Sequence, residues 1–336
     1  MTERVVLEQR ASTVLYHYLR SVARTGVWLL PANVCPIVPA VFKKAGIDYE
    51  FVDIDRQSLC MDPIPALLLL RRATSRYAGV LFVRSFGHCG DFGQFFRSVK
   101  AIDAGLKVID DRCLARPRFS AHKQDADLEL YSTGYAKFVD LGWGGWGILR
   151  GDESYLPAVQ AFEPGAHADL VEQFRMVLEE RGLFHCPQTP WLDMRTPEIG
   201  VEEFQFMVES RIEESALHRQ RLNAIYADQL EAWAVPAECR EWRFTIFCDC
   251  QQELIRAIFA AGHFASAHFR SLAPMFGPGD VSVADWCGKR VVNLFNDFRY
   301  DEDRAGQLAN IVRTVLQDHS APSCLAAGEL SFRGKA

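Results

Sequence analysis

Short apolar runs alternate with amphipathic stretches along the first 150 residues of the chain. Residues 14–22 place apolar side chains three or four positions apart, which is the spacing of one face of a helix. Helices are also predicted for residues 38–45 and 92–104. The strands predicted between them cover residues 27–30, 51–54, 79–83, 106–109 and 128–131. This alternation is typical of an α/β fold in which helices cover a mostly parallel sheet.

The second half of the chain predicts a smaller α/β unit. Prolines interrupt the pattern between about residues 150 and 200, so we expect an irregular segment that can move. A long helix is predicted for residues 201–233, followed by a strand at 242–248, a helix at 252–261 and a strand at 291–295. The expected organisation is a large domain over residues 1–200, a long helix and small C-terminal domain over 201–318, and a flexible tail over 319–336.

Composition narrows the class of protein. The 336 residues include 43 acidic and 37 basic side chains, which gives a net charge of −6 and no overall field for binding nucleic acid or an anionic membrane. The first ten residues are charged rather than apolar, and the longest aliphatic run, Ala66–Leu70, is too short to cross a bilayer. We therefore expect a soluble, cytoplasmic protein. The ten cysteines contain no CxxC motif, so buried free thiols are expected rather than a metal site.

Two predicted strands end in residues that can carry chemistry. In an open α/β sheet, sites lie at the carboxyl ends of the strands. One strand ends in Asp110 and Asp111, and another is followed by Ser132 and Lys137 in the sequence YSTGYAK, just ahead of a glycine cluster. Taken singly, each residue has an ordinary interpretation as a cap, a turn or a surface group.

A third feature lies at the start of the first predicted helix. Ser12 and Thr13 place two hydroxyl groups beside free backbone N–H groups, at the positive end of the helix dipole, where an anion binds favourably. A phosphate-holding helix, an acid after a central strand and then a lysine are the groups that a pyridoxal 5'-phosphate (PLP) enzyme needs. Their order along the chain therefore favours PLP chemistry.

Several stretches of the chain resemble the DegT/DnrJ/StrS family of PLP-dependent sugar aminotransferases. The resemblance covers residues 10–150 well and 240–315 loosely. It rests on WLLPANVCPIVPAVFKKAGIDYEFVDID, FVRSFGHCGDFGQF, GLKVIDDRCLA, YSTGYAK and GWGG, and toward the C-terminus on AGHFASAHFRSLAPMF and VVNLFND. It implies a fold-type-I PLP-dependent transferase, with a large, mostly parallel sheet domain and a small C-terminal α/β domain.

The resemblance also implies roles for particular residues. Lys137 would form the Schiff base with PLP and later move the proton, and Asp111 would hold the pyridine nitrogen. Neighbouring side chains of a strand face opposite sides, so only one of Asp110 and Asp111 can face the cofactor, and Asp111 is our choice. The implied phosphate contacts are Ser132, Ser12 and Thr13, and the substrate candidates are Arg84, His88 and His268.

The chain departs from the family pattern at three positions. Leu114 stands where the family has a polar Gln or His, Cys35 stands where an aromatic ring stacks on the cofactor, and Arg84 stands where a histidine precedes the glycine turn. The family's loop that reaches into the neighbouring subunit has no clear match between residues 165 and 200. The cofactor half of the site is therefore better matched than the substrate half.

The function implied by the resemblance is transfer of an amino group from an amino acid, with glutamate expected, to a nucleotide-linked keto-sugar. Such products serve surface-polysaccharide or secondary-metabolite biosynthesis, and a homodimer with shared active sites is expected. Two alternatives remain open: a PLP enzyme of the same fold that eliminates water or uses another amino substrate, and a degenerate relative without catalysis. Retention of both Lys137 and Asp111 favours an enzyme.

Overall fold

A seven-stranded sheet forms the centre of the larger domain. The computed structural model describes residues 3–121 and 125–319. The strands lie in the order β1 (Glu3–Glu8), β7 (Gly145–Arg150), β6 (Leu128–Ser132), β5 (Lys107–Asp111), β4 (Tyr77–Val83), β2 (Val27–Pro31) and β3 (Tyr49–Val52). The five strands from β6 to β3 pair in parallel, whereas β7 runs antiparallel to both of its neighbours.

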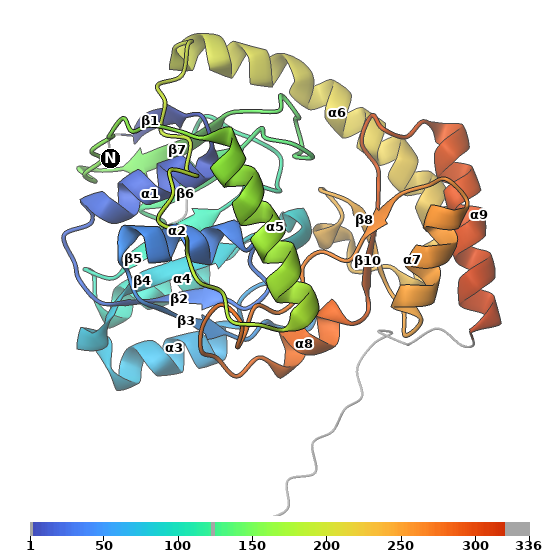
Figure 1. Ribbon diagram of the computed structural model, residues 1–336, viewed down its shortest axis with the longest axis horizontal. Coiled ribbons are helices and arrows are strands. Elements are labelled where there is room, and N and C mark those ends of the chain that lie inside the picture. The colour runs from blue at the N-terminus through green and yellow to red at the C-terminus, as the bar shows by residue number, and fades with distance from the viewer. Residues whose placement is uncertain (1–2, 122–124, 320–336) are drawn as a thin grey trace, which may run out of the picture.

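Helices cover both faces of this sheet (Figure 1). One apolar core contains residues of α1 (Ala11–Ser21), α2 (Ile37–Ala45) and α5 (Pro164–Glu180), and a second contains residues of α3 (Pro63–Arg72) and α4 (Gly93–Ile102). Side chains of a strand alternate between the two cores, so that Val108 of β5 packs with the second core and Ile109 with the first. The same alternation continues into the two acids that end β5.

The smaller domain has its own sheet and core. Its sheet has the antiparallel order β8 (Phe244–Phe247), β10 (Val291–Leu294) and β9 (Ala265–Ser266), packed on α7 (Gln251–Ala260) and α9 (Glu302–Asp318). The long helix α6 (Val201–Leu230) extends from the larger domain to the smaller one, as Figure 1 shows. The short 3₁₀ helices are η1 (Thr74–Arg76), η2 (Ser85–Gly87), η3 (Glu231–Trp233) and η4 (Ala237–Cys239).

The chain returns to the larger domain after β9. The segment that includes α8 (Ser282–Gly288) packs into the first core of the larger domain. There the Phe51 amide donates to the Pro278 carbonyl at 2.8 Å, and the Tyr49 hydroxyl donates to the Phe276 carbonyl at 2.6 Å. This segment covers the edge strand β3, whose backbone groups would otherwise be exposed to other chains.

The segment expected to be irregular contains a regular helix. Helix α5 has 17 residues, and Leu170, Phe174 and Val177 face the core at helical spacing. Pro164 is one of the prolines that predict an interruption of regular structure. It is the first residue of this helix, where its missing N–H costs nothing. The expectation was therefore wrong for residues 164–180. The expected tail from residue 320 onward lies outside the described residues.

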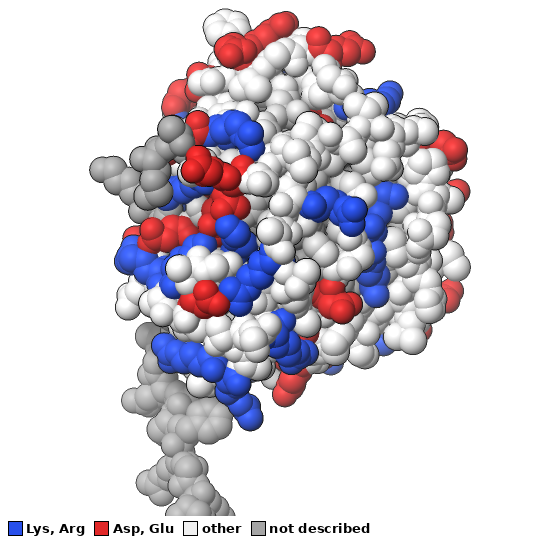
Figure 2. Space-filling view, turned by 90° about the vertical axis from the view of Figure 1, so that its left-hand side faces the viewer, with Lys and Arg blue, Asp and Glu red and all other residues white. Residues whose placement is uncertain are grey.

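The surface bears charges of both signs. Figure 2 shows Lys and Arg side chains interspersed with Asp and Glu on one face of the molecule. Among the residues that the structure describes, no helix has the length and apolar character needed to cross a membrane.

Two glycines, one in each domain, differ in the space around their Cα atoms. A Cβ atom at Gly145, the first residue of β7, would lie 1.9 Å from the Ala11 amide nitrogen, whereas a Cβ at Gly306 in α9 would meet nothing within 4 Å. We expect Gly145→Ala to lower the free energy of unfolding by about 1–3 kcal/mol because the start of α1 must shift. Gly306→Ala should raise it by about 0.5–1 kcal/mol through the lower entropy of the unfolded chain. Urea unfolding measures both, and equal effects would contradict this packing.

Candidate active site

Asp110 and Asp111 lie on opposite faces of the sheet, as the alternation of β5 requires. Asp111 is only 7% exposed, its carboxylate accepts a hydrogen bond from the Cys113 amide at 3.0 Å, and it forms no ion pair with any described residue. Burial raises the pKa of the Asp111 carboxyl, although the Cys113 hydrogen bonds and the charge of Lys137 oppose the shift. Asp111 is thus a buried acid that lacks a cation in direct contact.

Lys137 lies in the loop after β6 and shares the site of Asp111. The side chains that its ammonium group influences electrostatically come from three separate elements of the fold. They are Asp111 and Cys113 at the end of β5, Cys35 after β2, and His268 after β9. The structure therefore brings together two residues that the sequence predicted for the cofactor and one that it predicted for the substrate.

A second group of polar atoms lies where α1 begins. The Ser132 hydroxyl oxygen accepts from the Gly134 amide at 3.2 Å, and the Arg10 guanidinium donates to the Gly142 carbonyl at 3.0 Å. A Cβ atom at Gly134 would lie 3.4 Å from the Ser132 hydroxyl and 3.6 Å from the Arg10 guanidinium, so glycine keeps the space between them open. Ser12 lies half-buried in the first turn of α1 beside this space. A hydroxyl, a guanidinium and a helix N-terminus suit a phosphate group.

Thr13 does not belong to this group. Its side chain is fully buried, and its hydroxyl donates to the Asp193 carbonyl at 2.6 Å. The Thr13 hydroxyl therefore joins α1 to the segment after α5. Arg10, by contrast, was missed in the sequence, although a basic residue directly before the hydroxyls of a predicted helix start is a usable signal.

Arg84 is not a substrate residue, and that prediction was wrong. Its side chain is 0% exposed and forms two hydrogen bonds to the Asp110 carboxylate, at 2.8 and 2.9 Å. It also donates to the Gly90 carbonyl, and its guanidinium lies 4.7 Å from the centre of the Phe92 ring. Arg84 thus neutralises the acid on the far side of the sheet from Lys137.

The far-side pair is part of a larger buried network. The Arg112 guanidinium lies 2.7 Å from Asp110 and 3.6 Å from Glu129, which also pairs with Arg150 at 3.3 Å. Burial alone would raise the pKa of the Asp110 carboxyl, but the charges and hydrogen bonds of Arg84 and Arg112 together hold it below its ordinary value. Asp110 therefore stays ionised beneath the site.

The two predicted substrate histidines have different positions. The His88 Nδ1 atom accepts from the Gly90 amide at 2.9 Å and its ring packs on Phe92, so His88 stabilises a turn, and its assignment to the substrate stays a prediction. His268 lies within the field of Lys137 and beside Trp242, with ring centres 6.4 Å apart. Burial, followed by the charges of Arg243 and Lys137, lowers the pKa of His268, so its ring is neutral at pH 7.

No protein-family model and no curated protein matches this sequence. Solved structures do match its fold. A DegT DnrJ EryC1 StrS aminotransferase from Brucella abortus is 16% identical, with a TM-score of 0.68 over 93% of this chain and 86% of that one. DesI, solved with its TDP-sugar product, is 17% identical, with a TM-score of 0.71 over 94% and 81%. The sugar aminotransferase CalS13 from Micromonospora echinospora is 16% identical, with a TM-score of 0.67 over 92% and 87%.

The chain has the fold of the PLP-dependent aminotransferases. The predicted fold class, a large and mostly parallel sheet with a small C-terminal α/β domain, is therefore confirmed. Across the described residues, no three His, Cys, Asp or Glu side chains come together as metal ligands. The side chains within electrostatic range of Lys137, those of Asp111, Cys113, Cys35 and His268, form the candidate site.

The buried network beneath the site predicts how strongly Arg84 contributes to the stability of the fold. Arg84→Met should lower the free energy of unfolding by about 3–5 kcal/mol, because the Asp110 carboxylate loses its bidentate partner while remaining buried. Arg97→Met is the matched control, since Arg97 is 60% exposed and lies 4.0 Å from Asp125, and it should change stability by less than about 0.5 kcal/mol. Urea unfolding at neutral pH compares the two. Similar losses in both variants would contradict a structural role for Arg84.

Proposed function

We propose that this protein is a PLP-dependent aminotransferase that moves an amino group from an amino acid to a nucleotide-linked keto-sugar. The observation that carries the proposal is the position of Lys137 within electrostatic range of Asp111, a buried carboxylate without an ion pair among the described residues. An acid in that state costs free energy unless a cation joins it. The protonated ring nitrogen of PLP is such a cation.

The residues around the pair fit the rest of the cofactor. The space kept open at Gly134 lies between the Ser132 hydroxyl and the Arg10 guanidinium, beside the first turn of α1. Ser132, Ser12 and Arg10 would hold the phosphate, while Asp111 would hold the ring nitrogen. These four residues, from the ends of β5 and β6 and the start of α1, would hold the cofactor at both of its ends.

When bound, PLP supplies an electron sink that allows a bond at the carbon next to the amino nitrogen to break. Lys137 would bind PLP through its amine and, once displaced by the substrate, would take up the proton from that carbon and return it. The Asp111 carboxylate keeps the ring nitrogen protonated by offering it a negative partner in a buried setting. His268, held neutral, can donate or accept a hydrogen bond on the substrate side.

The substrate class is taken from the similar structures and from the family resemblance. DesI was solved with its TDP-sugar product, and CalS13 is a sugar aminotransferase. We therefore propose a nucleotide-linked keto-sugar as acceptor, glutamate as donor and the cytoplasm as location. Products of this kind serve surface-polysaccharide or secondary-metabolite biosynthesis.

Two positions favour a second candidate function. Cys35 offers a smaller surface than an aromatic ring at the place where the ring would stack, and the apolar Leu114 is buried where the family has a polar contact. Weaker support of the ring would suit a PLP enzyme with another outcome, such as elimination of water from the substrate. The amino donor distinguishes the two candidates, because an eliminating enzyme does not consume glutamate as a donor.

The proposal is tested with the absorbance spectrum of the protein mixed with PLP, before and after glutamate is added. The wild type should show the band of lysine-linked PLP, and glutamate should convert it to the pyridoxamine form. Lys137→Ala should lack the lysine-linked band. Asp111→Asn should still bind PLP, but conversion should slow by about a hundredfold or more because the ring nitrogen loses its charged partner.

Each outcome of this experiment decides between the candidates. A band that glutamate leaves unchanged points to the eliminating enzyme or to another donor, and normal conversion by Lys137→Ala contradicts the assignment. If the wild type forms no band, the protein is better described as a relative without catalysis.

We also propose that the protein is a homodimer with shared active sites. Several large apolar side chains are more exposed than a lone chain favours, among them Phe206 on α6, which is 75% exposed, and Leu156 and Val159 after β7. Sedimentation equilibrium should therefore give twice the mass of the chain. A single-chain mass at micromolar concentration would contradict the dimer.

A further inference from the structure

Three successive backbone carbonyls around Lys137 accept hydrogen bonds from side chains distant in sequence. The indole N–H of Trp242 donates to the Ala136 carbonyl at 2.7 Å. The Arg219 guanidinium donates to the Lys137 carbonyl at 3.0 Å and to the Phe138 carbonyl at 3.2 Å. Side chains from outside the loop therefore hold Lys137, the residue expected to bind the cofactor, through the backbone carbonyls at and beside it.

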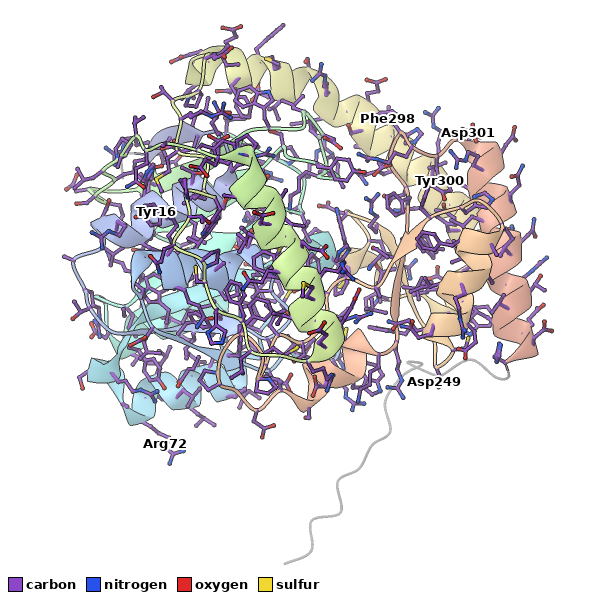
Figure 3. All side chains as sticks on the ribbon, in the orientation of Figure 1. Tyr16, Arg72, Asp249, Phe298, Tyr300 and Asp301 are labelled. Atoms are coloured by element: carbon purple, nitrogen blue, oxygen red, sulfur yellow. The ribbon has the colours of Figure 1, made fainter. Side chains whose placement is uncertain are left out.

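Arg219 is itself fixed by partners in the smaller domain. Its other terminal nitrogen donates to the Trp242 carbonyl at 2.7 Å and to the Asn296 side-chain oxygen at 2.6 Å. The Asn296 amide nitrogen in turn donates to Asn223 of α6 at 2.9 Å. Residues 296–300 follow β10 and lie against α6, where Figure 3 labels Phe298 and Tyr300. Arg219 thus joins α6, the exit of β10 and the lysine loop at one point.

The charged guanidinium of Arg219 donates its hydrogen bonds to neutral oxygen atoms. Its side chain is 4% exposed and forms no ion pair with a described residue. Burial lowers the pKa of Arg219 to about 10, although Asp297 opposes the shift, so the guanidinium remains charged at pH 7. A buried cation bound to four carbonyl and amide oxygens forms stronger hydrogen bonds than a neutral donor would.

The lysine loop includes a residue in an unfavourable backbone conformation and borders a cavity. Ala136 has φ of 59°, in the left-handed region that a side chain disfavours. A cavity of about 480 Å³ lies against the loop, and its lining includes Lys137 and Arg219. Within the loop, the Ala136 amide donates to the Asp140 carboxylate at 2.8 Å and the Lys137 amide donates to the Gly134 carbonyl at 3.3 Å, and the outside donors add to these bonds on the side of the cavity.

We propose that Arg219 and Trp242 form a clamp that positions Lys137 for its reaction with the cofactor. The two residues touch the backbone of the lysine loop rather than the reacting atoms, so they are positioning residues. The clamp also makes the position of Lys137 depend on the smaller domain, because Arg219 is bound by Asn296, which follows β10. The effect of the clamp on PLP binding to Lys137 rests on the proposed function. The effect of the clamp on the stability of the loop does not.

Trypsin tests the hold on the loop, because the bond after Lys137 is a tryptic site and its carbonyl is the one that Arg219 binds. We expect Trp242→Phe, which removes one donor from a ring of similar shape, to speed cleavage after Lys137 about fivefold in the full chain without added PLP. Arg219→Gln should speed it by about fivefold to thirtyfold, because several bonds are lost.

Arg221→Gln is the matched control. Arg221 lies two residues further along α6, is 63% exposed and pairs with Glu302 at 3.7 Å, so its loss should leave cleavage after Lys137 unchanged. The proposal is overturned if neither clamp variant speeds this cleavage, or if all tryptic sites become faster together, since that would report loss of the whole fold. If Arg219→Gln does not fold, the result with Trp242→Phe decides.

Borohydride trapping tests the consequence for the cofactor. Reduction fixes PLP that is linked to a lysine, and mass spectrometry then gives the fraction of bound PLP attached to Lys137. That fraction should be nearly complete in the wild type and in Arg221→Gln. It should fall several-fold in Arg219→Gln while total PLP binding is retained, and it should recover in part in Arg219→Lys. Equal fractions in all variants overturn the positioning role, whereas no trapping in the wild type overturns the proposed function and leaves the trypsin result standing.

Discussion

A carboxylate buried in a protein is costly without a positive partner, and the two acids at the end of β5 face opposite sides of the sheet with different partners. Asp110 is held from inside the fold, by Arg84 and Arg112. Asp111 has Lys137 within electrostatic range but no ion pair in the described chain. An unpaired carboxylate at Asp110 would raise the pKa of the neighbouring Asp111, so neutralising Asp110 helps Asp111 to stay ionised and to bind a cation.

The rest of the larger domain serves this arrangement. Parallel strands bring the exits of β2, β5 and β6 to one edge, so that residues 35, 111 and 137 share a site despite their separation in sequence. The antiparallel strand β7 then brings Gly145 directly against Ala11, and the first turn of α1 thereby approaches the loop that contains Ser132 and Gly134. The sheet thus fixes the separation between the acidic end and the phosphate end of the candidate site.

Periodicity predicted most of the larger domain, because its strands are buried on both faces and its helices keep one apolar face. It also predicted which acid faces the site, since alternation along a strand follows from backbone geometry. The strands β1 and β7 were not predicted; glycine occupies two of the six positions of β7, whose packing against α1 leaves no room for a Cβ at Gly145. Helix α5 was missed because Pro164 reads as a break unless its place at the first helical turn is known.

Side-chain roles were harder to predict than elements. Arg84 was assigned to the substrate because the sequence does not show whether a polar residue after a strand faces the site or the core. Arg219 and Trp242 gave no signal, since they lie 82 and 106 residues from the carbonyls that they bind. Contacts of that kind depend on where two domains meet, which a one-dimensional pattern does not contain.

The position of the lysine also explains why the smaller domain belongs to the site without contributing the main chemical groups. A flexible side chain reacts efficiently only if its backbone is fixed, because each freely moving torsion lowers the chance that the amine meets its target. In this chain the loop around Lys137 has a left-handed residue at Ala136 and borders a cavity, and donors from outside add to the hydrogen bonds that the loop makes within itself. Asn296 and Trp242 bind one of these donors, Arg219. The smaller domain is therefore connected to the chemistry through the backbone carbonyls of Ala136, Lys137 and Phe138.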